Sequence, residues 1–213
     1  MADDQDAIYY VQGEDLRSVA RSPHLDYFRS HDIEVLFLVE PIDSFMVSTL
    51  KEYDGKPLRN VDDAKLDLPQ RDDSTEEGPE HIAEPEFNRL IGRFVTVLGD
   101  RVLEVRESNV LTESPCRLAS ADDGPLNEMS RVYRMLDQEF ELPKRILEIN
   151  RRHPIIINLA ELVDKEPEAS IIDPAIEQLF ENQLLMEGLH PNPTDMIPRI
   201  QQLMETATAM KEA

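Results

Sequence analysis

The sequence of 213 residues has one cysteine, Cys116, and only seven glycines. A single cysteine excludes an internal disulfide framework and any zinc site built from several cysteines. The glycines form neither the GxGxxG pattern of a dinucleotide site nor a phosphate-binding GxxxxGK(S/T) loop. The chain therefore lacks the usual sequence signals of a nucleotide-dependent enzyme.

Basic residues are also scarce, since 22 Lys and Arg stand against 44 Asp and Glu and give a formal net charge of −22. This balance argues against a nucleic-acid partner, because binding to a phosphate backbone needs clustered cations. It also argues against binding to anionic membranes. No stretch approaches the roughly 20 apolar residues of a membrane span, and no apolar signal region follows Met1. We therefore expect a reducing, cytoplasmic compartment.

Signals of catalysis or metal binding are missing too. The five histidines do not pair at metal-ligand spacing, and His24, His31 and His153 lie in or beside predicted turns, which favours surface positions. Cys116 opens a predicted strand and is interpreted as a small buried core residue. The carboxylates are spread along solvated faces, so no catalytic pair stands out. We predict no catalytic residues and no metal site in this chain.

Hydrophobic patterning predicts an α+β / α/β protein of two domains. Residues 1–70 show strands at 7–11, 33–39 and 58–61 alternating with helices, as in a small layered domain with a mostly parallel sheet. The apolar run at 33–39 is typical of a strand buried on both faces. Residues 71–86 are acidic and poor in apolar side chains, which predicts a linker.

The second domain, 87–213, is expected to be α+β. Apolar spacing predicts helices at 87–98, 126–136 and 155–163, and β-rich runs predict strands at 102–105, 116–119 and 146–149. A helical hairpin then ends the chain, with Gly188 in its turn and Thr194 as the N-cap of the last helix.

The apolar residues of this hairpin form two stripes at helical spacing. The first helix carries Ile172, Ala175, Ile176, Leu179, Gln183 and Met186, and the second carries Met196, Ile197, Ile200, Leu203, Met204, Ala207 and Met210. A two-helix hairpin buries one face of each helix, so apolar surface remains. The surplus packs either on the rest of the chain or on a second copy, in a four-helix bundle across a two-fold axis. The pattern alone does not separate the two.

Seven segments in order resemble the ninety-kilodalton heat-shock chaperone (Hsp90) family, in particular its bacterial HtpG-type members. They are IYY with GE at 8–14, SPHL at 22–25, EVLFLVEPID at 34–43, LKEYDGK at 50–56, LGDRV at 98–102, LTESP at 111–115 and LEIN with HP at 147–154. The resemblance implies a C-terminal fragment: a small αβα end of the middle domain, then the C-terminal dimerisation domain. ATP and magnesium would bind to the full-length protein, outside this chain.

The resemblance also implies partners and their sites. The last two helices would form a homodimer, through Ile172, Ala175, Ile176, Leu179, Met186, Met196, Ile197, Ile200, Leu203 and Met204. Unfolded or partly folded client proteins would contact Phe45, Ser48, Met129, Val132 and Tyr133. The acidic tail motif that recruits tetratricopeptide co-chaperones is absent from the sequence. The substitution Leu179→Asp or Ile200→Asp is expected to separate the protomers, because it would bury a charge in the interface.

Two other functions fit parts of the sequence. One is a monomeric adaptor that uses the terminal hairpin to bind a different protein. The other is a stand-alone enzyme built on the first domain, which would need a polar pocket near residues 40–45.

Overall fold

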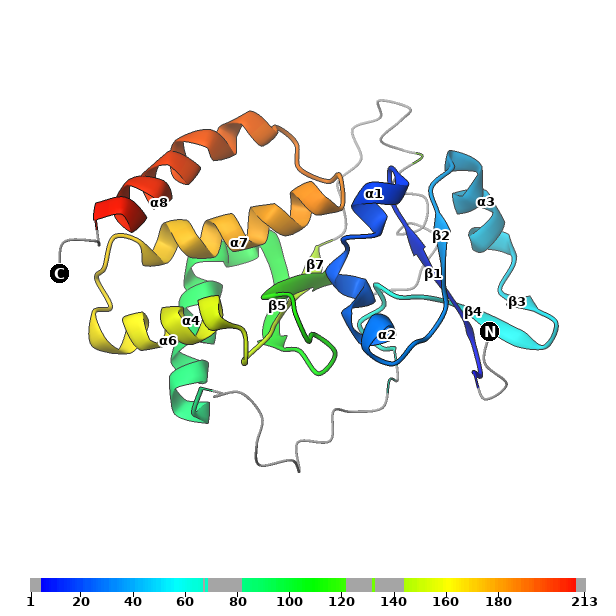
Figure 1. Cartoon of the computed structure of the whole chain (residues 1–213), viewed down its shortest axis with the longest axis horizontal. Helices are drawn as coiled ribbons and strands as arrows, with labels where there is room; N and C mark the ends of the chain where they lie inside the picture. Colours follow the sequence, from blue (N-terminus) through cyan, green and yellow to red (C-terminus); the bar gives the residue numbers. More distant parts are fainter. Residues whose placement is uncertain (1–4, 67, 69–81, 122–131, 133–143, 210–213) are drawn as a thin grey trace.

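The computed structural model describes residues 5–66, 68, 82–121, 132 and 144–209. Two sheets lie side by side, the first at the right of Figure 1 and the second near its centre. The part of the chain described here contains no helix that is long and apolar enough to cross a bilayer.

The first sheet has the strand order β2-β1-β4-β3. Strands β1 (Ile8–Gln12), β2 (Val35–Leu38) and β4 (Lys56–Asn60) are parallel, and β3 (Glu52–Tyr53) forms an antiparallel hairpin with β4. The predicted mostly parallel sheet is therefore confirmed.

Short helices cover this sheet. On one face, Tyr9 and Val35 pack against a core formed by η1 (Pro23–Leu25) and α2 (Asp26–Ser30), with α1 (Leu16–Val19) beside them. Ser22 caps η1 through its hydroxyl, as its place before Pro23 predicts. Gln12, whose side chain points to the other face, donates to Ser44 Oγ of α3 (Pro41–Thr49) at 3.0 Å. The sheet thus lies between α2 and α3.

The prediction that the apolar run at 33–39 is buried on both faces is wrong. Leu36 and Phe37 of β2 are both exposed. The reason is the strand order, because β2 is an edge strand and has a neighbour on one side only among the described residues.

The second sheet has the order β5-β7-β6. Strands β5 (Val102–Glu107) and β7 (Arg145–Ile149) are parallel, and β6 (Cys116–Ala119) is antiparallel to β7. All three strands were predicted at these positions. Helices α4 (Glu84–Leu98) and α7 (Ile172–Met186) pack on the sheet, α6 (Pro154–Lys165) packs against these two helices, and the 3₁₀ turn η2 (Gly99–Arg101) follows α4. Their shared core holds fully buried side chains: Leu90, Phe94, Leu147, Ile156 and Ile176.

The terminal hairpin consists of α7, the 3₁₀ turn η3 (Pro193–Met196) and α8 (Ile197–Ala209), which lies along the top of Figure 1. Gly188 has a φ of 65°, as expected of a residue that ends a helix. The predicted N-cap at Thr194 is wrong. Pro193, whose ring fixes φ, begins η3 after the extended Asn192, so Thr194 lies inside a 3₁₀ turn before α8.

Several predictions fall on other parts of the chain. The predicted helix at 126–136, with Met129 and Tyr133, lies outside the described residues except for Val132, as does Met210. Most of the predicted linker at 71–86 does so too, and α4 already begins at Glu84, with Pro85 in its first turn. The division into two domains stays a prediction.

Candidate functional site

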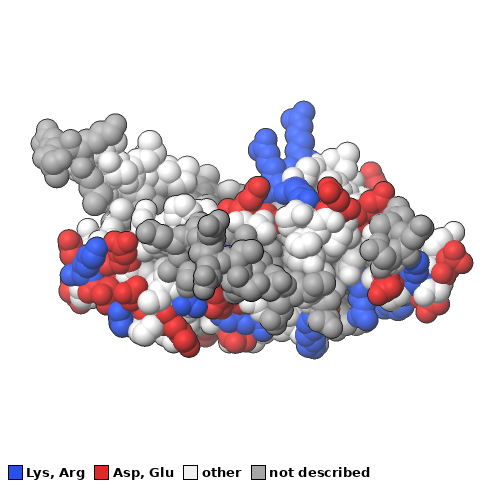
Figure 2. All heavy atoms as spheres, turned by 60° about the horizontal axis from the view of Figure 1, so that its bottom comes forward, with Lys and Arg blue, Asp and Glu red and all other residues white. Residues whose placement is uncertain are grey.

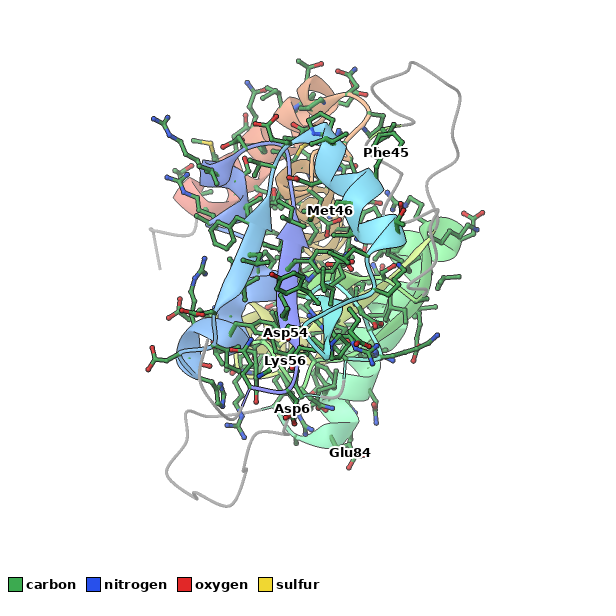
Figure 3. All side chains as sticks on the ribbon, turned by 90° about the vertical axis from the view of Figure 1, so that its right-hand side faces the viewer. Asp6, Phe45, Met46, Asp54, Lys56 and Glu84 are labelled. Atoms are coloured by element: carbon green, nitrogen blue, oxygen red, sulfur yellow. The ribbon has the colours of Figure 1, made fainter. Side chains whose placement is uncertain are left out.

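The outer face of α3 is apolar and open to solvent. Ser44 and Val47 point to the sheet and are buried, whereas Ile42 (69% exposed), Phe45, Met46 and Leu50 are all exposed. Figure 3 labels Phe45 and Met46 on this helix. Single exposed apolar residues are normal, but three on one short helix with a fourth, Leu50, as its C-cap make a surface that suits contact with another protein.

The predicted client residues have different surroundings. Phe45 belongs to the open face of α3. Ser48 is half-buried, and its hydroxyl donates to the carbonyl oxygen of Phe45 at 2.9 Å. Val132 is buried and therefore offers packing rather than accessible surface, and Met129 and Tyr133 lie outside the described residues. Only Phe45 of this set is shown with an accessible side chain.

The predicted interface residues of α7 mostly face inward. Ile172, Ile176 and Leu179 are buried in the core of the second sheet, and Ala175 packs against that core. The cause is that α7 lies against α4 and β6, which take up its apolar stripe. These residues stabilise the fold of the single chain, which is one of the two arrangements that their spacing left open, and their place in a dimer interface stays a prediction.

The interface residues of α8 and the end of α7 are largely open. Helix α8 buries none of its residues: Ile197 is 50% and Met204 is 61% exposed, and Ile200 and Leu203 are half-buried. Met186 at the end of α7 is also exposed, whereas Met196 of η3 is buried. The stripe 197, 200, 203 and 204 follows helical spacing, so it forms one apolar face, which is only partly covered among the described residues.

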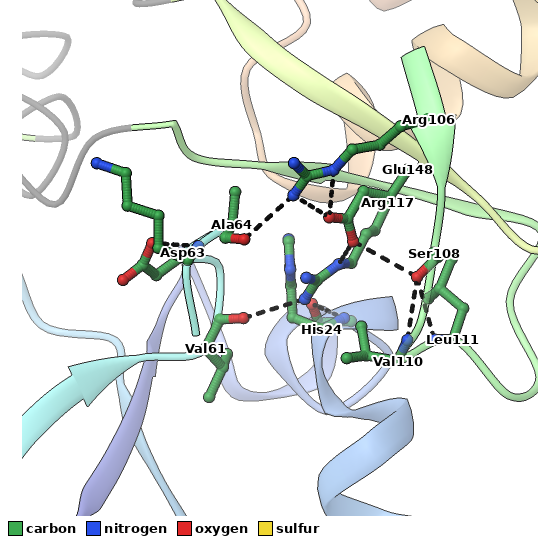
Figure 4. A network of polar contacts seen from close by, with 12 residues as sticks. His24, Val61, Asp63, Ala64, Arg106, Ser108, Val110, Leu111, Arg117 and Glu148 are labelled. Atoms are coloured by element: carbon green, nitrogen blue, oxygen red, sulfur yellow. Dashed lines mark hydrogen bonds and ion pairs between the residues drawn. The ribbon is translucent and has the colours of Figure 1, made fainter. Parts of the chain in front are cut away.

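A polar network joins the segment that follows β4 of the first sheet to the second sheet (Figure 4). The sequence did not predict this network. Glu148 of β7 accepts hydrogen bonds from Arg117 Nε and from an Arg106 guanidinium nitrogen, both at 2.7 Å. Arg117 Nη1 also donates to the carbonyl of Val61 at 3.3 Å, and the same Arg106 nitrogen that binds Glu148 at 2.7 Å donates to the carbonyl of Ala64 at 3.1 Å. Burial alone would raise the pKa of Glu148, but the two guanidinium groups outweigh it and hold the pKa below its ordinary value.

Backbone contacts reinforce this junction. The amide of Ala64 donates to the carbonyl of Ser120 at 2.8 Å, and the amide of Ser120 donates to that of Asp62 at 2.7 Å. The buried carboxylate of Asp26 accepts hydrogen bonds from the amides of Glu113 at 3.1 Å and Ser114 at 2.8 Å. Segments on both sides of the linker are thus held together at several points.

The end of α7 joins the same junction. His24 Nε2 lies 3.2 Å from Glu187 Oε1, and Arg145 contacts Glu187 at 2.9 Å and Asp62 at 3.4 Å. The surface position predicted for His24 is wrong, because Pro23 places it in η1 against this acidic residue, where it is 4% exposed. Burial tends to raise the pKa of Glu187, and the charge of Arg145 with the contact to His24 lowers it below its ordinary value.

The sequence did hold one signal for the junction. His24, Ser114 and Glu148 lie inside the SPHL, LTESP and LEIN segments that carried the resemblance. Nothing in their spacing indicated that they would meet, because they are brought together by packing across the two sheets.

Catalytic chemistry finds no support in the described residues. Burial raises the pKa of the Cys116 thiol to about 12, although a hydrogen bond with Gln183 opposes the shift. Such a thiol is not a nucleophile at neutral pH. No group of three or more His, Cys, Asp or Glu is positioned to hold a metal ion within the part of the chain that the structure describes.

On the face shown in Figure 2, acidic and basic side chains are interspersed.

Comparison with known proteins assigns the family. The family model described as Hsp90 protein matches residues 1–213. The chaperone protein HtpG of Chlorobium phaeovibrioides is 36% identical over 208 residues, which cover 98% of this chain and 33% of the relative. HtpG of Chlorobaculum tepidum is 37% identical over 214 residues, with the same coverage, and HtpG of Mycolicibacterium gilvum is 36% identical over 189 residues, 88% of this chain and 29% of the relative.

The chain thus spans about a third of the length of the curated relatives that it matches. The match extends across both sheets and the terminal hairpin, which confirms the resemblance that the seven segments indicated. The chain belongs to the Hsp90 family.

Proposed function

We propose that this chain is the part of an Hsp90-type chaperone that joins two copies and offers client proteins a binding surface. The observation that carries the proposal is the partly uncovered apolar face of α8, where Ile197 and Met204 are among the most exposed large apolar side chains. It is supported by the likeness to chaperone proteins called HtpG. Its setting would be the cytoplasm, in agreement with the single, buried cysteine.

Energetics favour a second copy as the cover of this face. Burying an apolar side chain of this size is worth about 1.5–3 kcal/mol relative to leaving it in water. A two-fold axis beside α8 would bring the same face of two chains together, and each stripe residue would then be buried in both chains. The interface would consist of α8 with the end of α7, including Met186, rather than of the whole of α7.

Dimerisation would serve the complete chaperone rather than this chain alone. Two chains held at one end keep their remaining parts at a high effective concentration, which promotes contacts between them. ATP and magnesium would act on those parts. In the complete chaperone this part of the chain would hold two copies together and would carry out no chemical step.

The client surface in this proposal is the outer face of α3. An exposed apolar surface that includes a methionine adapts to partners of different shape, as contact with unfolded chains requires. Phe45 and Met46 supply the aromatic ring and the flexible thioether there.

The test is the molar mass by light scattering over a dilution series. The proposal expects a mass near twice 24.5 kDa for the natural chain. Ile200→Asp is expected to be monomeric, because the new carboxylate would be buried in the dimer. Gln202→Asp, on the exposed opposite side of α8, is the matched control and is expected to stay dimeric.

A monomer at all concentrations would contradict the proposal. It would favour the adaptor function, in which α8 binds a different protein. An Ile200→Asp variant that remains dimeric would show that another surface joins the copies.

A further inference from the structure

A cavity of about 290 Å³ opens beside the second half of α7, next to β6 and the start of β7. Its apolar wall is built mainly by Leu118, Phe180, Leu184 and Leu189. Leu118, Phe180 and Leu189 are buried, so the wall is part of the folded protein's core. This volume is at the lower end of the range that holds small organic ligands.

Several contacts support the wall of this cavity. The guanidinium carbon of Arg101 lies 5.3 Å from the centre of the Phe180 ring, and the same guanidinium binds both oxygens of Glu177, at 2.7 and 2.5 Å. The amide of Leu189 donates to the carbonyl of Leu184 at 2.7 Å, in the turn made by Gly188. Arg101 thus contacts the ring of Phe180, and the backbone at Leu189 is held by its hydrogen bond to Leu184.

The charged residues at the cavity are all cations. Arg101, Lys144 and Arg145 line it, and no carboxylate does among the described lining residues. This is the opposite of the chain's average, in which Asp and Glu outnumber Lys and Arg by 44 to 22. An apolar cavity with a cationic rim is complementary to a ligand that joins a hydrocarbon body to a negative group.

The three cations differ in how far they are already neutralised. Arg101 is paired with Glu177, and Arg145 with Asp62 and Glu187. Lys144 Nζ lies 3.5 Å from a carboxylate oxygen of Asp100, whose side chain is almost entirely in water. Such a solvated pair is easily exchanged for another anion. One cation is therefore open to recruitment, which matches a ligand with a single negative charge.

We propose that this cavity binds a small amphipathic monocarboxylate, of the class of medium-chain fatty acids and aryl-alkanoic acids. The hydrocarbon lies against Phe180, Leu184 and Leu189, and the carboxylate binds the ammonium group of Lys144. This site is separate from α8 and from the outer face of α3.

Isothermal titration calorimetry of the 213-residue chain with octanoate tests the proposal. Saturable binding of one octanoate per chain is expected, and octylammonium is expected to bind at least about tenfold more weakly, because it carries the wrong charge. Lys144→Gln should weaken octanoate about fivefold, as for an ion pair at a partly exposed site, and leave the binding of 1-octanol unchanged. Lys165→Gln removes the same charge from an exposed position on α6 and should change nothing.

A second variant tests the location. Leu184→Phe adds volume to the wall and should weaken octanoate and 1-octanol alike, with the fold checked by circular dichroism. Absence of saturable octanoate binding overturns the proposal. So does equal binding of octanoate and octylammonium, or an unchanged affinity in Lys144→Gln, which as a surface substitution leaves the fold intact.

Discussion

Arg117 Nε donates a hydrogen bond to Glu148 Oε2 at 2.7 Å, and both side chains are buried. The pair connects the neighbouring strands β6 and β7 of the second sheet. Arg117 also donates to the carbonyl of Val61, which follows β4 of the first sheet. Arg117→Met keeps much of the side-chain volume but leaves part of a buried carboxylate without its partner. We expect a loss of about 3–5 kcal/mol in the free energy of unfolding, measured by urea denaturation.

The matched control is an ion pair in water. Arg89 and Asp164 lie 2.5 Å apart, with side chains 49% and 44% exposed. Arg89→Met should therefore cost less than about 1 kcal/mol. Equal losses in the two variants would mean that the junction contributes no more than a surface contact.

The pH dependence of stability follows from the lowered pKa values of Glu148 and Glu187. A carboxylate with a lower pKa in the folded than in the unfolded protein stabilises the fold above its unfolded value. That stabilisation is lost as the pH falls through the folded pKa. The free energy of unfolding should therefore decrease as the pH falls below the ordinary value of 4.5.

Glu148→Gln separates this residue from the other carboxylates of the chain. At pH 7 the variant should be less stable than the natural protein, and the difference should shrink as the pH is lowered. Parallel curves for the two proteins would show that Glu148 does not titrate at an altered pKa.

Much of this fold was predictable because its signals are local. The helix predicted at 87–98, which in the structure begins at Glu84, and the strands around Val105, Leu118 and Leu147 follow from residues adjacent in sequence. What depends on neighbours distant in the sequence was not predictable. The run at 33–39 reads the same in a central and in an edge strand, and only the strand order tells them apart.

The same limit applies to the functional surfaces. The stripes of α7 and α8 look alike in the sequence, yet α7 lies on the second sheet and α8 does not. His24 stands in a turn-like segment, but it is buried beside Glu187, which is 163 residues further along the chain. Periodicity shows that a face is apolar, but it does not show what covers it.

Leu179→Asp and Ile200→Asp, which the sequence treats as equivalent, should therefore behave differently. Leu179 is buried in the core, so a carboxylate there should unfold the second sheet's packing, with loss of the cooperative thermal transition. Ile200→Asp should keep the native circular dichroism spectrum and change only the association. A folded Leu179→Asp variant would contradict the position of α7.

Phe45 should matter for the binding of unfolded chains. Phe45→Ser removes the ring from the outer face of α3 without disturbing the buried Val47, and we expect about fivefold weaker binding of a fluorescent unfolded protein. Val95→Ser is the control, because Val95 of α4 is as exposed but lies on a different surface. Equal effects of the two substitutions would indicate non-specific binding to exposed apolar side chains rather than a site on α3.

Gly188, in the hairpin turn, lies where an added Cβ atom would meet the Glu14 side chain, and the effect of this proximity can be isolated. Gly188 and Gly55 have φ values of 65° and 76°, so alanine at either position should cost about 1–2 kcal/mol of backbone strain. A Cβ atom at Gly55 would meet nothing within 4 Å, whereas at Gly188 it would come within 2.4 Å of a carboxylate oxygen of Glu14. Gly188→Ala should therefore lower the free energy of unfolding further than Gly55→Ala does.

Glu14→Ala then completes the comparison. If the excess cost arises from the displaced Glu14 side chain, Gly188→Ala should cost less in the Glu14→Ala background than in the natural protein, and close to what Gly55→Ala costs. Strictly additive losses would show instead that Glu14 moves aside without consequence. The turn between α7 and α8 would then be set by its own backbone, independently of the Glu14 side chain.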